Sequence, residues 1–194
     1  DLYLKELRKI CDQKDWLLML DEIQTGYGRT GSFFCYQNSG ITPDIATLAK
    51  GLGNGVPIGV CLAKGQASEL MRPGNHGSTF GGNPFICHVA SAVLDEIERQ
   101  NLPKRAGDLG LRMKKKFKDR IGSLNIVKEI RGIGLMLGIE LNEPCSHLVG
   151  RALEKKILIN VTAGNVIRLL PPLTVSDAEA DQICELVCQL VEGR

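Results

Sequence analysis

Several features that define whole classes of protein are missing from this sequence of 194 residues. No apolar run approaches the roughly 20 residues that a membrane-spanning helix requires. Basic residues number 24 against 22 acidic residues, so no excess of one charge favours binding to nucleic acid or to a membrane surface. No signal peptide is visible, because the opening DLYLKELRKICD is typical of an amphipathic helix. We therefore expect neither nucleic acid nor a membrane as a partner.

The cysteines form no C-x-x-C pair, although there are seven of them. Their odd number and wide scatter argue against a disulfide framework and against a zinc site, which favours a cytoplasmic protein without a metal. Cys184 and Cys188 lie one helical turn apart and could in principle bind a metal. No nearby histidine or further cysteine completes a ligand set, so we interpret both as small buried apolar residues.

Alternating helix and strand patterns fill the first half of the chain, whose 43% overall hydrophobic content suits a globular core. They predict an α/β sheet, with the following elements: a helix over 2–14 and strands over 16–20, 45–49 and 58–63. A helical pattern after Pro84 runs to Pro103, where we expect the proline to break it. We place a domain boundary there, between residues 1–102 and residues 103–194.

The second half predicts a small α/β domain with its own helices and strands. The expected elements are helices over 104–122, 146–156 and 177–191 and strands over 125–130, 134–141, 157–161 and 166–170. Ser176 is a plausible N-cap for the last helix. In the first of these helices, the lysines at 114–116 suit a solvated face, with Leu111, Phe117 and Ile121 on the buried face.

Two chemically complementary residues follow neighbouring apolar runs. Asp21 ends the run Leu17–Leu20, and Lys50 follows Ala46–Ala49 and precedes a glycine-rich loop. Ligands of open α/β sheets bind beyond the carboxyl ends of strands. A partly buried Asp21 carboxylate there needs a cationic partner such as a pyridinium N–H, while a lysine amine forms a Schiff base with an aldehyde. The pair therefore suits pyridoxal 5′-phosphate (PLP).

Simpler interpretations of each residue exist. An aspartate after a strand is often an N-cap or a surface residue, and a lysine there often snorkels to solvent. The run K-G-L-G-N-G could suggest a phosphate loop, but it lacks the order G-x-x-x-x-G-K-[ST]. The occurrence of both residues within longer sequence blocks favours the PLP site.

Five such blocks occur in one order along the chain: DEIQTGYGRTG, PDIATLAKGLGNGVPIG, PGNHGSTFGGNP, IRGIGLMLGIEL and VIRLLPPLTVS. With them the chain resembles the class III (ornithine-type) PLP-dependent aminotransferases, and among these the acetylornithine type. The resemblance implies fold type I, with part of the large PLP-binding domain sheet in residues 1–102 and the C-terminal small α/β domain in residues 103–194. It covers about the second half of the family pattern. We therefore expect a truncated chain that lacks the upstream phosphate-binding turn, the ring-stacking aromatic and an upstream substrate arginine.

The resemblance also implies roles for the residues around the first two blocks. Lys50 would form the Schiff base and move the substrate proton, and Asp21 would keep the pyridine nitrogen protonated. Gln24 would contact the phenolic oxygen of the cofactor, with a hydrogen bond inside its own turn as the alternative. Glu22 and Ile23 would line the same cofactor-binding turn.

The later blocks imply substrate contacts and a shared active site. Ser78 would lie close to substrate, and Thr79 would reach the phosphate of the neighbouring subunit's cofactor, which implies a homodimer. Arg168 would bind the α-carboxylate of the amino acid, with a structural ion pair to a glutamate of the small domain as the alternative. Arg29 and Arg131 are interpreted as packing residues.

The implied activity is ping-pong transamination between N-acetylornithine and 2-oxoglutarate, hence arginine biosynthesis, with succinyl-diaminopimelate as a possible second donor. Other class III enzymes, acting on ornithine, succinylornithine or 4-aminobutyrate, are close alternatives. A catalytically inactive PLP-binding fragment is an alternative of another kind.

Overall fold

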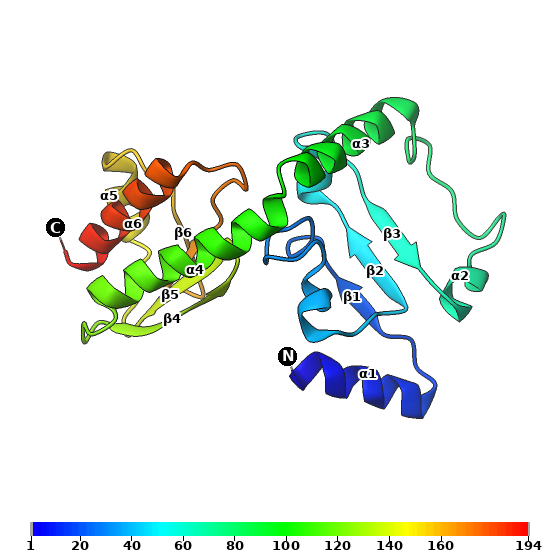
Figure 1. Cartoon of the computed structure of the whole chain (residues 1–194), viewed down its shortest axis with the longest axis horizontal. Helices are drawn as coiled ribbons and strands as arrows, with labels where there is room; N and C mark the ends of the chain where they lie inside the picture. Colours follow the sequence, from blue (N-terminus) through cyan, green and yellow to red (C-terminus); the bar gives the residue numbers. More distant parts are fainter. Residues whose placement is uncertain (1, 194) are drawn as a thin grey trace. The chain divides into compact units, whose positions relative to one another are not determined.

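The chain forms two compact units in a computed structural model that describes residues 2–193. The units are Asp1–Pro103 and Lys104–Arg194, and each combines helices with one sheet (Figure 1). Within the described residues, no helix has both the length and the apolar character needed to cross a membrane. The assignment of the units to a PLP-binding domain and a small domain stays a prediction.

A three-stranded sheet with the order β1-β2-β3 organises the first unit. Its elements are α1 (Leu2–Lys14), β1 (Met19–Asp21), the 3₁₀ helix η1 (Cys35–Ser39), β2 (Ile45–Leu48), the 3₁₀ helix η2 (Lys50–Gly53), β3 (Val60–Ala63), α2 (Gln66–Leu70) and α3 (Pro84–Arg99). Strand β1 runs parallel to β2, and β3 runs antiparallel to it. Parallel pairing brings the carboxyl ends of β1 and β2 to the same edge.

Strand β1 begins later than the predicted strand over 16–20. The Trp16 N–H donates to the carbonyl of Cys11 at 2.9 Å, and Asp15 has a φ of 55°, so these residues close the end of α1. Asp44 then fixes the start of the sheet, because it accepts hydrogen bonds from Arg8 at 2.6 Å and from the Leu18 N–H at 2.8 Å.

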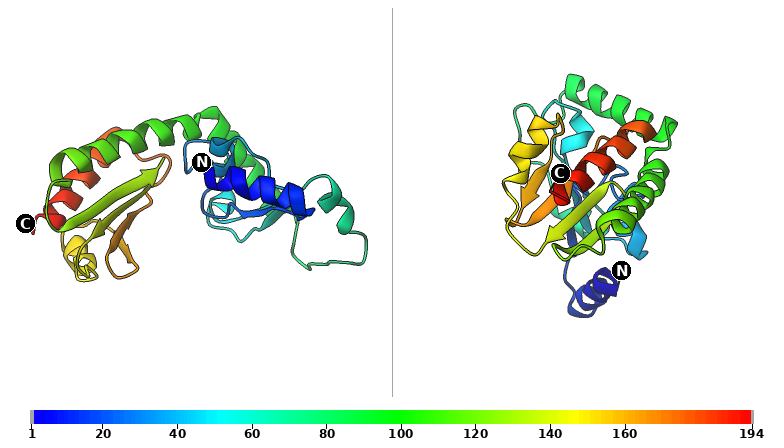
Figure 2. Two further views of the ribbon diagram at one scale, coloured as in Figure 1. Left: turned by 90° about the horizontal axis from the view of Figure 1, so that it is seen from below. Right: turned by 90° about the vertical axis from the view of Figure 1, so that its left-hand side faces the viewer.

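A four-stranded antiparallel sheet with the order β4-β5-β7-β6 organises the second unit. Its elements are α4 (Leu102–Ile121), β4 (Val127–Ile133), β5 (Met136–Leu141), α5 (Leu148–Glu154), β6 (Asn160–Thr162), β7 (Val166–Leu169) and α6 (Asp177–Val191). Helices α4 and α6 lie side by side over the sheet (Figure 2). Their buried side chains and those of the sheet form one core, which includes Met113, Phe117, Ile139, Ile167 and Val187.

The expected break near Pro103 is confirmed, whereas one expectation about α4 is wrong. Helix α3 ends at Arg99 and α4 begins at Leu102, so Pro103 lies in the first turn of the new helix, where a missing N–H is tolerated. Leu111 is 63% exposed, because the buried face follows Leu109, Met113 and Phe117 at intervals of four residues. The burial expected for Cys184 and Cys188 is confirmed, and desolvation raises the pKa of each thiol to about 11.

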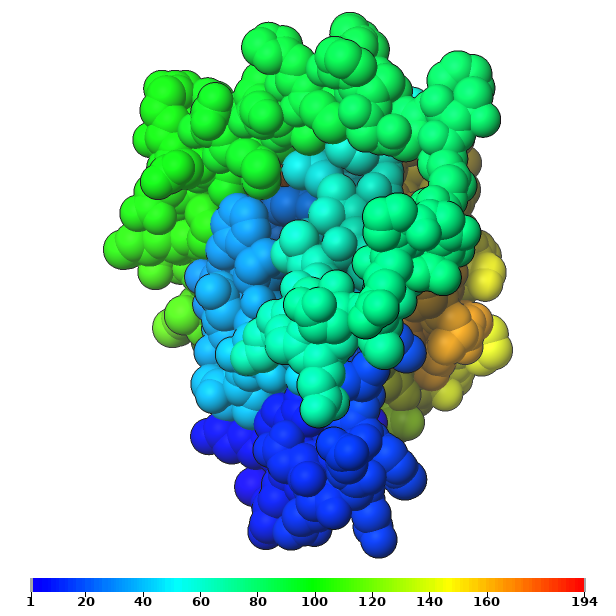
Figure 3. All heavy atoms as spheres, turned by 90° about the vertical axis from the view of Figure 1, so that its right-hand side faces the viewer, coloured from blue at the N-terminus to red at the C-terminus, as the bar shows by residue number. Residues whose placement is uncertain are grey.

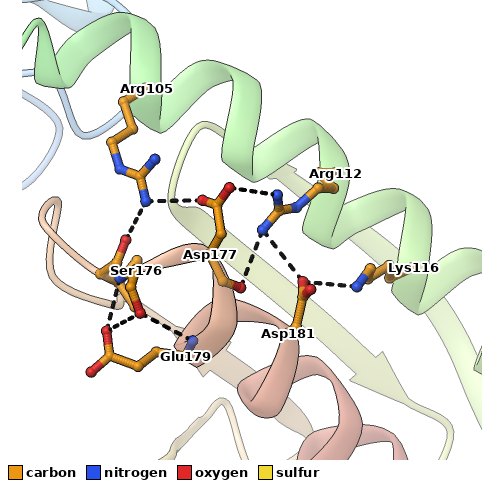
Figure 4. A network of polar contacts seen from close by, with 8 residues as sticks. Arg105, Arg112, Lys116, Ser176, Asp177, Glu179 and Asp181 are labelled. Atoms are coloured by element: carbon orange, nitrogen blue, oxygen red, sulfur yellow. Dashed lines mark hydrogen bonds and ion pairs between the residues drawn. The ribbon is translucent and has the colours of Figure 1, made fainter.

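An ion-pair network joins α4 to the start of α6 (Figure 4). Arg112 pairs with Asp177 at 3.0 Å and with Asp181 at 3.3 Å, while Arg105 donates to the Val175 carbonyl at 2.5 Å. The predicted N-cap is confirmed, since the Ser176 hydroxyl accepts the Glu179 N–H at 3.2 Å within a capping box. These contacts fix the loop that follows β7.

Candidate functional site

Asp21 and Lys50 leave the first sheet at the same edge. Asp21 is the last residue of β1 and pairs in register with Thr47 of β2, and Lys50 follows Thr47 by three residues. Because the two strands are parallel neighbours, both residues stand at their carboxyl ends. This is the edge at which α/β sheets bind ligands.

The Asp21 carboxylate is exposed, which corrects the expectation that it is partly buried. Strand β1 lies at the edge of the sheet, and Asp21 shares its face with Met19, which is 67% exposed. One carboxylate oxygen, Oδ1, accepts the Ile23 N–H at 2.9 Å. Among residues 2–193, the other oxygen has no hydrogen-bond partner, so it is open to a donor from a ligand.

Lys50 has a strained backbone, which the sequence did not predict. It is exposed and begins η2. Its φ of 47° lies in the left-handed region that residues other than glycine rarely adopt. The turn is closed by the Leu52 N–H, which donates to the Ala49 carbonyl at 3.2 Å, and Leu52 and Gly53 are buried. Such strain persists where the surrounding structure enforces it, and it gathers at functional sites.

The Glu22 side chain points into its own loop. It is 3% exposed and accepts hydrogen bonds from the Thr25 hydroxyl at 2.7 Å, the Cys35 N–H at 3.0 Å and the Tyr36 N–H at 2.9 Å. Burial, together with the nearby Glu22 carboxylate, raises the pKa of Tyr36. All three of these hydrogen bonds are made to groups of the protein. The expected contact between Glu22 and the cofactor therefore stays a prediction.

Ile23 and Gln24 complete the turn after β1, and both are half-buried. Ile23 contributes its N–H to Asp21. No hydrogen bond of the Gln24 amide is found within the described residues, so the alternative of a bond inside its own turn has no support there. Arg29 lies nearby in sequence, and its desolvation lowers the pKa of the guanidinium, in keeping with the packing role expected for it.

Ser78 and Thr79 lie in an exposed loop. Every residue from 68 to 82 is exposed, and Figure 3 shows this segment at the surface. The Ser78 hydroxyl accepts the Gly81 N–H at 3.0 Å, which closes a turn inside the loop. The loop ends at Asn83, whose side chain accepts the Ile86 N–H at 3.1 Å and caps α3.

Two arginines share one face of the second sheet. Arg131 and Arg168 both pair in register with Gly138, and Asn160 pairs with Arg168 from the other side. Arg131 is neutralised by Glu129 at 2.7 Å and by Glu140, and these hydrogen bonds raise its pKa, the one to Glu140 most strongly.

Among residues 2–193, Arg168 has no such neutralising partner. Its Nε is buried and has no hydrogen-bond partner, and within residues 2–193 no carboxylate pairs with the guanidinium. The alternative of a structural ion pair is therefore not found in the described chain. Arg168 lines an open groove of about 760 Å³ together with Leu158, Asn160, Pro171 and Ile183. A ligand carboxylate would satisfy the unpaired guanidinium.

The donor set of the first unit fits PLP. Asp21 offers an unused carboxylate oxygen, which suits a pyridinium N–H, and Lys50 offers an exposed amine, which suits an aldehyde. The hydroxyls of Ser78 and Thr79 lie in a glycine-flanked exposed loop, where backbone and side-chain donors suit a phosphate. The ring nitrogen and the aldehyde thus each have a chemically matched group in this chain, and the loop of Ser78 and Thr79 offers donors that suit a phosphate.

Comparisons with known proteins point to one family. Residues 1–191 match the class-III aminotransferase family. The acetylornithine aminotransferase of Nitrosomonas europaea is 53% identical over 189 residues, which is 97% of this chain and 48% of that protein. The Aquifex aeolicus protein of the same name is 44% identical, with the same coverage. The chain thus spans about half the length of the curated relatives it matches.

Solved structures show the same similarity. The ornithine aminotransferase of Toxoplasma gondii superposes with a TM-score of 0.93 at 35% identity, covering 99% of this chain and 48% of that one. The acetylornithine aminotransferase of Elizabethkingia anophelis gives 0.92 at 32% identity, covering 99% and 52%. A second structure of the Toxoplasma enzyme is described with PLP at partial occupancy in its active site.

Proposed function

The chain belongs to the class III aminotransferases, a PLP-dependent family of fold type I, and we propose that it is part of an enzyme that transaminates N-acetylornithine with 2-oxoglutarate. The observation that carries this proposal is the placement of Asp21 and Lys50 at the carboxyl ends of two paired parallel strands. Relatives named acetylornithine aminotransferase, at 42–53% identity, support this donor. Among solved structures, an ornithine and an acetylornithine aminotransferase match at similar identities, 35% and 32%.

The cofactor, when bound, supplies an aldehyde for covalent attachment and a ring that withdraws electrons from the substrate Cα. Asp21 would accept the ring N–H with its free oxygen and so keep the ring nitrogen protonated. Lys50 would hold the aldehyde carbon and would later take the proton from the substrate Cα through its Nζ. Gln24 would donate to the phenolic oxygen, and Ile23 would contribute backbone and apolar contact.

The remaining roles involve substrate and a second subunit. Arg168 would bind the α-carboxylate, since its guanidinium lacks a partner in the described chain and lines a groove. Ser78 would approach the substrate, and Thr79 would donate to the phosphate of the cofactor in the neighbouring subunit. This arrangement requires a homodimer, and the reaction, run in reverse to form N-acetylornithine, would serve arginine biosynthesis.

The first experiment is a PLP titration followed by borohydride reduction and mass spectrometry. It uses this chain alone and a hybrid in which the upstream half of the Nitrosomonas europaea relative precedes it. We expect a trapped pyridoxyl group on Lys50 in the hybrid, no trapped group in Lys50→Ala, and normal trapping in Lys64→Ala, whose lysine is also exposed.

Each outcome decides something different. An adduct on this chain alone would mean that this half assembles a cofactor site by itself. An adduct only in the hybrid would mean that PLP attachment needs the upstream half. This chain alone would then be a catalytically inactive fragment. Transamination that persists in the hybrid carrying Lys50→Ala would reject the assignment.

Substrate choice needs a separate measurement. The ratio of kcat/KM for N-acetylornithine to that for ornithine should be similar in the hybrid and in the unmodified Nitrosomonas protein. A shift of the hybrid towards ornithine would favour the second candidate, an ornithine aminotransferase, which the Toxoplasma structure suggests at a TM-score of 0.93.

A further inference from the structure

We propose that Glu22 is a positioning residue, which fastens the turn after β1 to the start of η1 and thereby orients Asp21 and Gln24 for the cofactor. The part that concerns the cofactor rests on the proposed function. The part that concerns the turn rests on contacts within this chain alone.

The contacts of Glu22 tie three segments of the first unit together. Its side chain accepts three hydrogen bonds, of which two come from the backbone N–H groups of Cys35 and Tyr36. Its own N–H donates to the Thr47 carbonyl of β2 at 2.9 Å, and its carbonyl accepts the Gly26 N–H at 2.9 Å. One residue therefore joins the end of β1, the neighbouring strand and the 3₁₀ helix.

The chemistry of these contacts calls for a carboxylate. Cys35 and Tyr36 begin η1, and the first N–H groups of a helix have no partner within it. A buried carboxylate is costly unless hydrogen-bonded, and among residues 2–193 no basic side chain forms an ion pair with Glu22. The backbone donors therefore supply the stabilisation, through charge-assisted bonds that are stronger than neutral ones.

The position of Glu22 links this anchor to the chemistry. It lies between Asp21 and Ile23, whose N–H holds the Asp21 carboxylate at 2.9 Å. Gly26 closes the same turn so tightly that a Cβ there would lie 2.9 Å from the Glu22 carbonyl oxygen. Because Glu22 is only 3% exposed, its influence on a ligand has to pass through Asp21 and Gln24.

The test replaces Glu22 by glutamine in this chain and in the hybrid. Glutamine keeps the shape but turns an NH₂ donor towards N–H groups that are donors themselves. Glu98→Gln is the matched control, because Glu98 is exposed on α3. A second variant, Thr25→Val, removes only the hydroxyl donor and keeps the test open if Glu22→Gln does not fold.

Hydrogen exchange of this chain without PLP tests the anchor. We expect the amides of Cys35, Tyr36 and Ile23 to exchange at least about tenfold faster in Glu22→Gln, because losing a hydrogen bond to a charged group changes an equilibrium by that factor or more. Thr25→Val should accelerate the same amides less, and Glu98→Gln should not. Faster exchange confined to Cys35 and Tyr36 would overturn the proposal, since the turn would then keep its place without Glu22.

The hybrid tests the consequence for the cofactor. We expect Glu22→Gln to raise the Kd for PLP about tenfold or more and to shift the pH midpoint of the visible absorption band. An unchanged Kd and pH midpoint would overturn the proposal. If the unsubstituted hybrid takes up no PLP, the proposed function fails, and the exchange of Ile23 still decides whether Glu22 holds the turn.

Discussion

Replacing Gly110 by alanine tests a close approach between α4 and the turn that joins β4 to β5 in the second unit. Gly110 lies in α4, and a Cβ there would stand 1.9 Å from the carbonyl oxygen of Gly134 and 2.4 Å from its carbonyl carbon. Ordinary contact begins at 3.4 Å, so the two backbones have to separate by about 1.5 Å, from 3.4 minus 1.9. No change of rotamer relieves the clash, because the backbone fixes the position of the alanine Cβ and the Gly134 carbonyl is itself a backbone group.

The expected cost follows from that displacement. Alanine favours a helix over glycine by about 1 kcal/mol. Against this, a gap of even 0.5–1 Å removes roughly a quarter to a half of the dispersion well of each contact, and Leu109 and Met113 are buried next to Gly110 at 4% and 0% exposure. We expect the variant to lose about half of the packing free energy of these two side chains and to gain overpacking strain. The net loss in the free energy of unfolding is then about 3 kcal/mol.

Urea unfolding followed by circular dichroism measures this loss, and hydrogen exchange of the Phe117 and Ile139 amides assigns it to the second unit. Gly150→Ala is the control: Gly150 is exposed in α5 and a Cβ there would meet nothing within 4 Å. That variant should gain up to about 1 kcal/mol. The reasoning is refuted if Gly110→Ala stays within about 1 kcal/mol of the unsubstituted chain while Gly150→Ala gains stability.

Phe117→Ala should cost about 3–5 kcal/mol by urea unfolding, because the ring is fully buried in the core of the second unit; a loss below about 1 kcal/mol would contradict that burial. Ser176→Ala should cost about 1 kcal/mol through the lost N-cap, whereas an unchanged midpoint would mean that the capping box adds nothing. Arg8 and the Leu18 N–H hold the pKa of Asp44 below its usual range. The stability from this contact is therefore present above about pH 4 and lost as the pH falls through the lowered pKa. Asp44→Asn should narrow the difference between urea midpoints at pH 7 and pH 3, and an unchanged difference would count against the ion pair.

The long periodic elements could be predicted from the sequence. Helix α1 has the expected bounds, α6 follows the expected Ser176 cap, and β2 differs from the predicted strand by one residue. These elements are governed by local patterns, namely an apolar stripe at helical spacing, a capping hydroxyl and a short apolar run.

The two largest errors in the predicted strand starts, at β1 and β6, have one cause. Strands β1 and β6 begin about three residues late, because the end of the preceding helix uses the next N–H groups. Asp15 and Lys156 take left-handed φ values of 55° and 60°, and the following N–H returns to the carbonyl five residues back, at 2.9 Å and 3.0 Å. Glycine is the residue that usually indicates such a helix end in a sequence. With an aspartate or a lysine at that position, the helix end cannot be predicted from the residue type.

The candidate site divides in the same way. Asp21 and Lys50 could be placed from the sequence, since a strand end is a local property and parallel neighbours share an edge. The exposure of Asp21 and the strain at Lys50 depend on which strand lies at the edge and on how η2 closes. Arg131 and Arg168 occur in equally strong blocks and pair with the same Gly138. Only the structure shows that carboxylates neutralise Arg131, whereas the buried Nε of Arg168 has no partner among residues 2–193.

Glu22 shows why such supporting contacts escape a sequence pattern. A buried carboxylate needs donors, and the pattern around Glu22 does not show where they come from. Two of its three donors prove to be the backbone N–H groups of Cys35 and Tyr36, 13 and 14 residues further along the chain. Every residue except proline carries a backbone N–H, so the residue types at these positions do not indicate that the N–H groups bind a carboxylate. The side chains that would meet the cofactor can therefore be identified from their chemistry, whereas the group that orients them becomes visible only when the turn and η1 are placed in three dimensions.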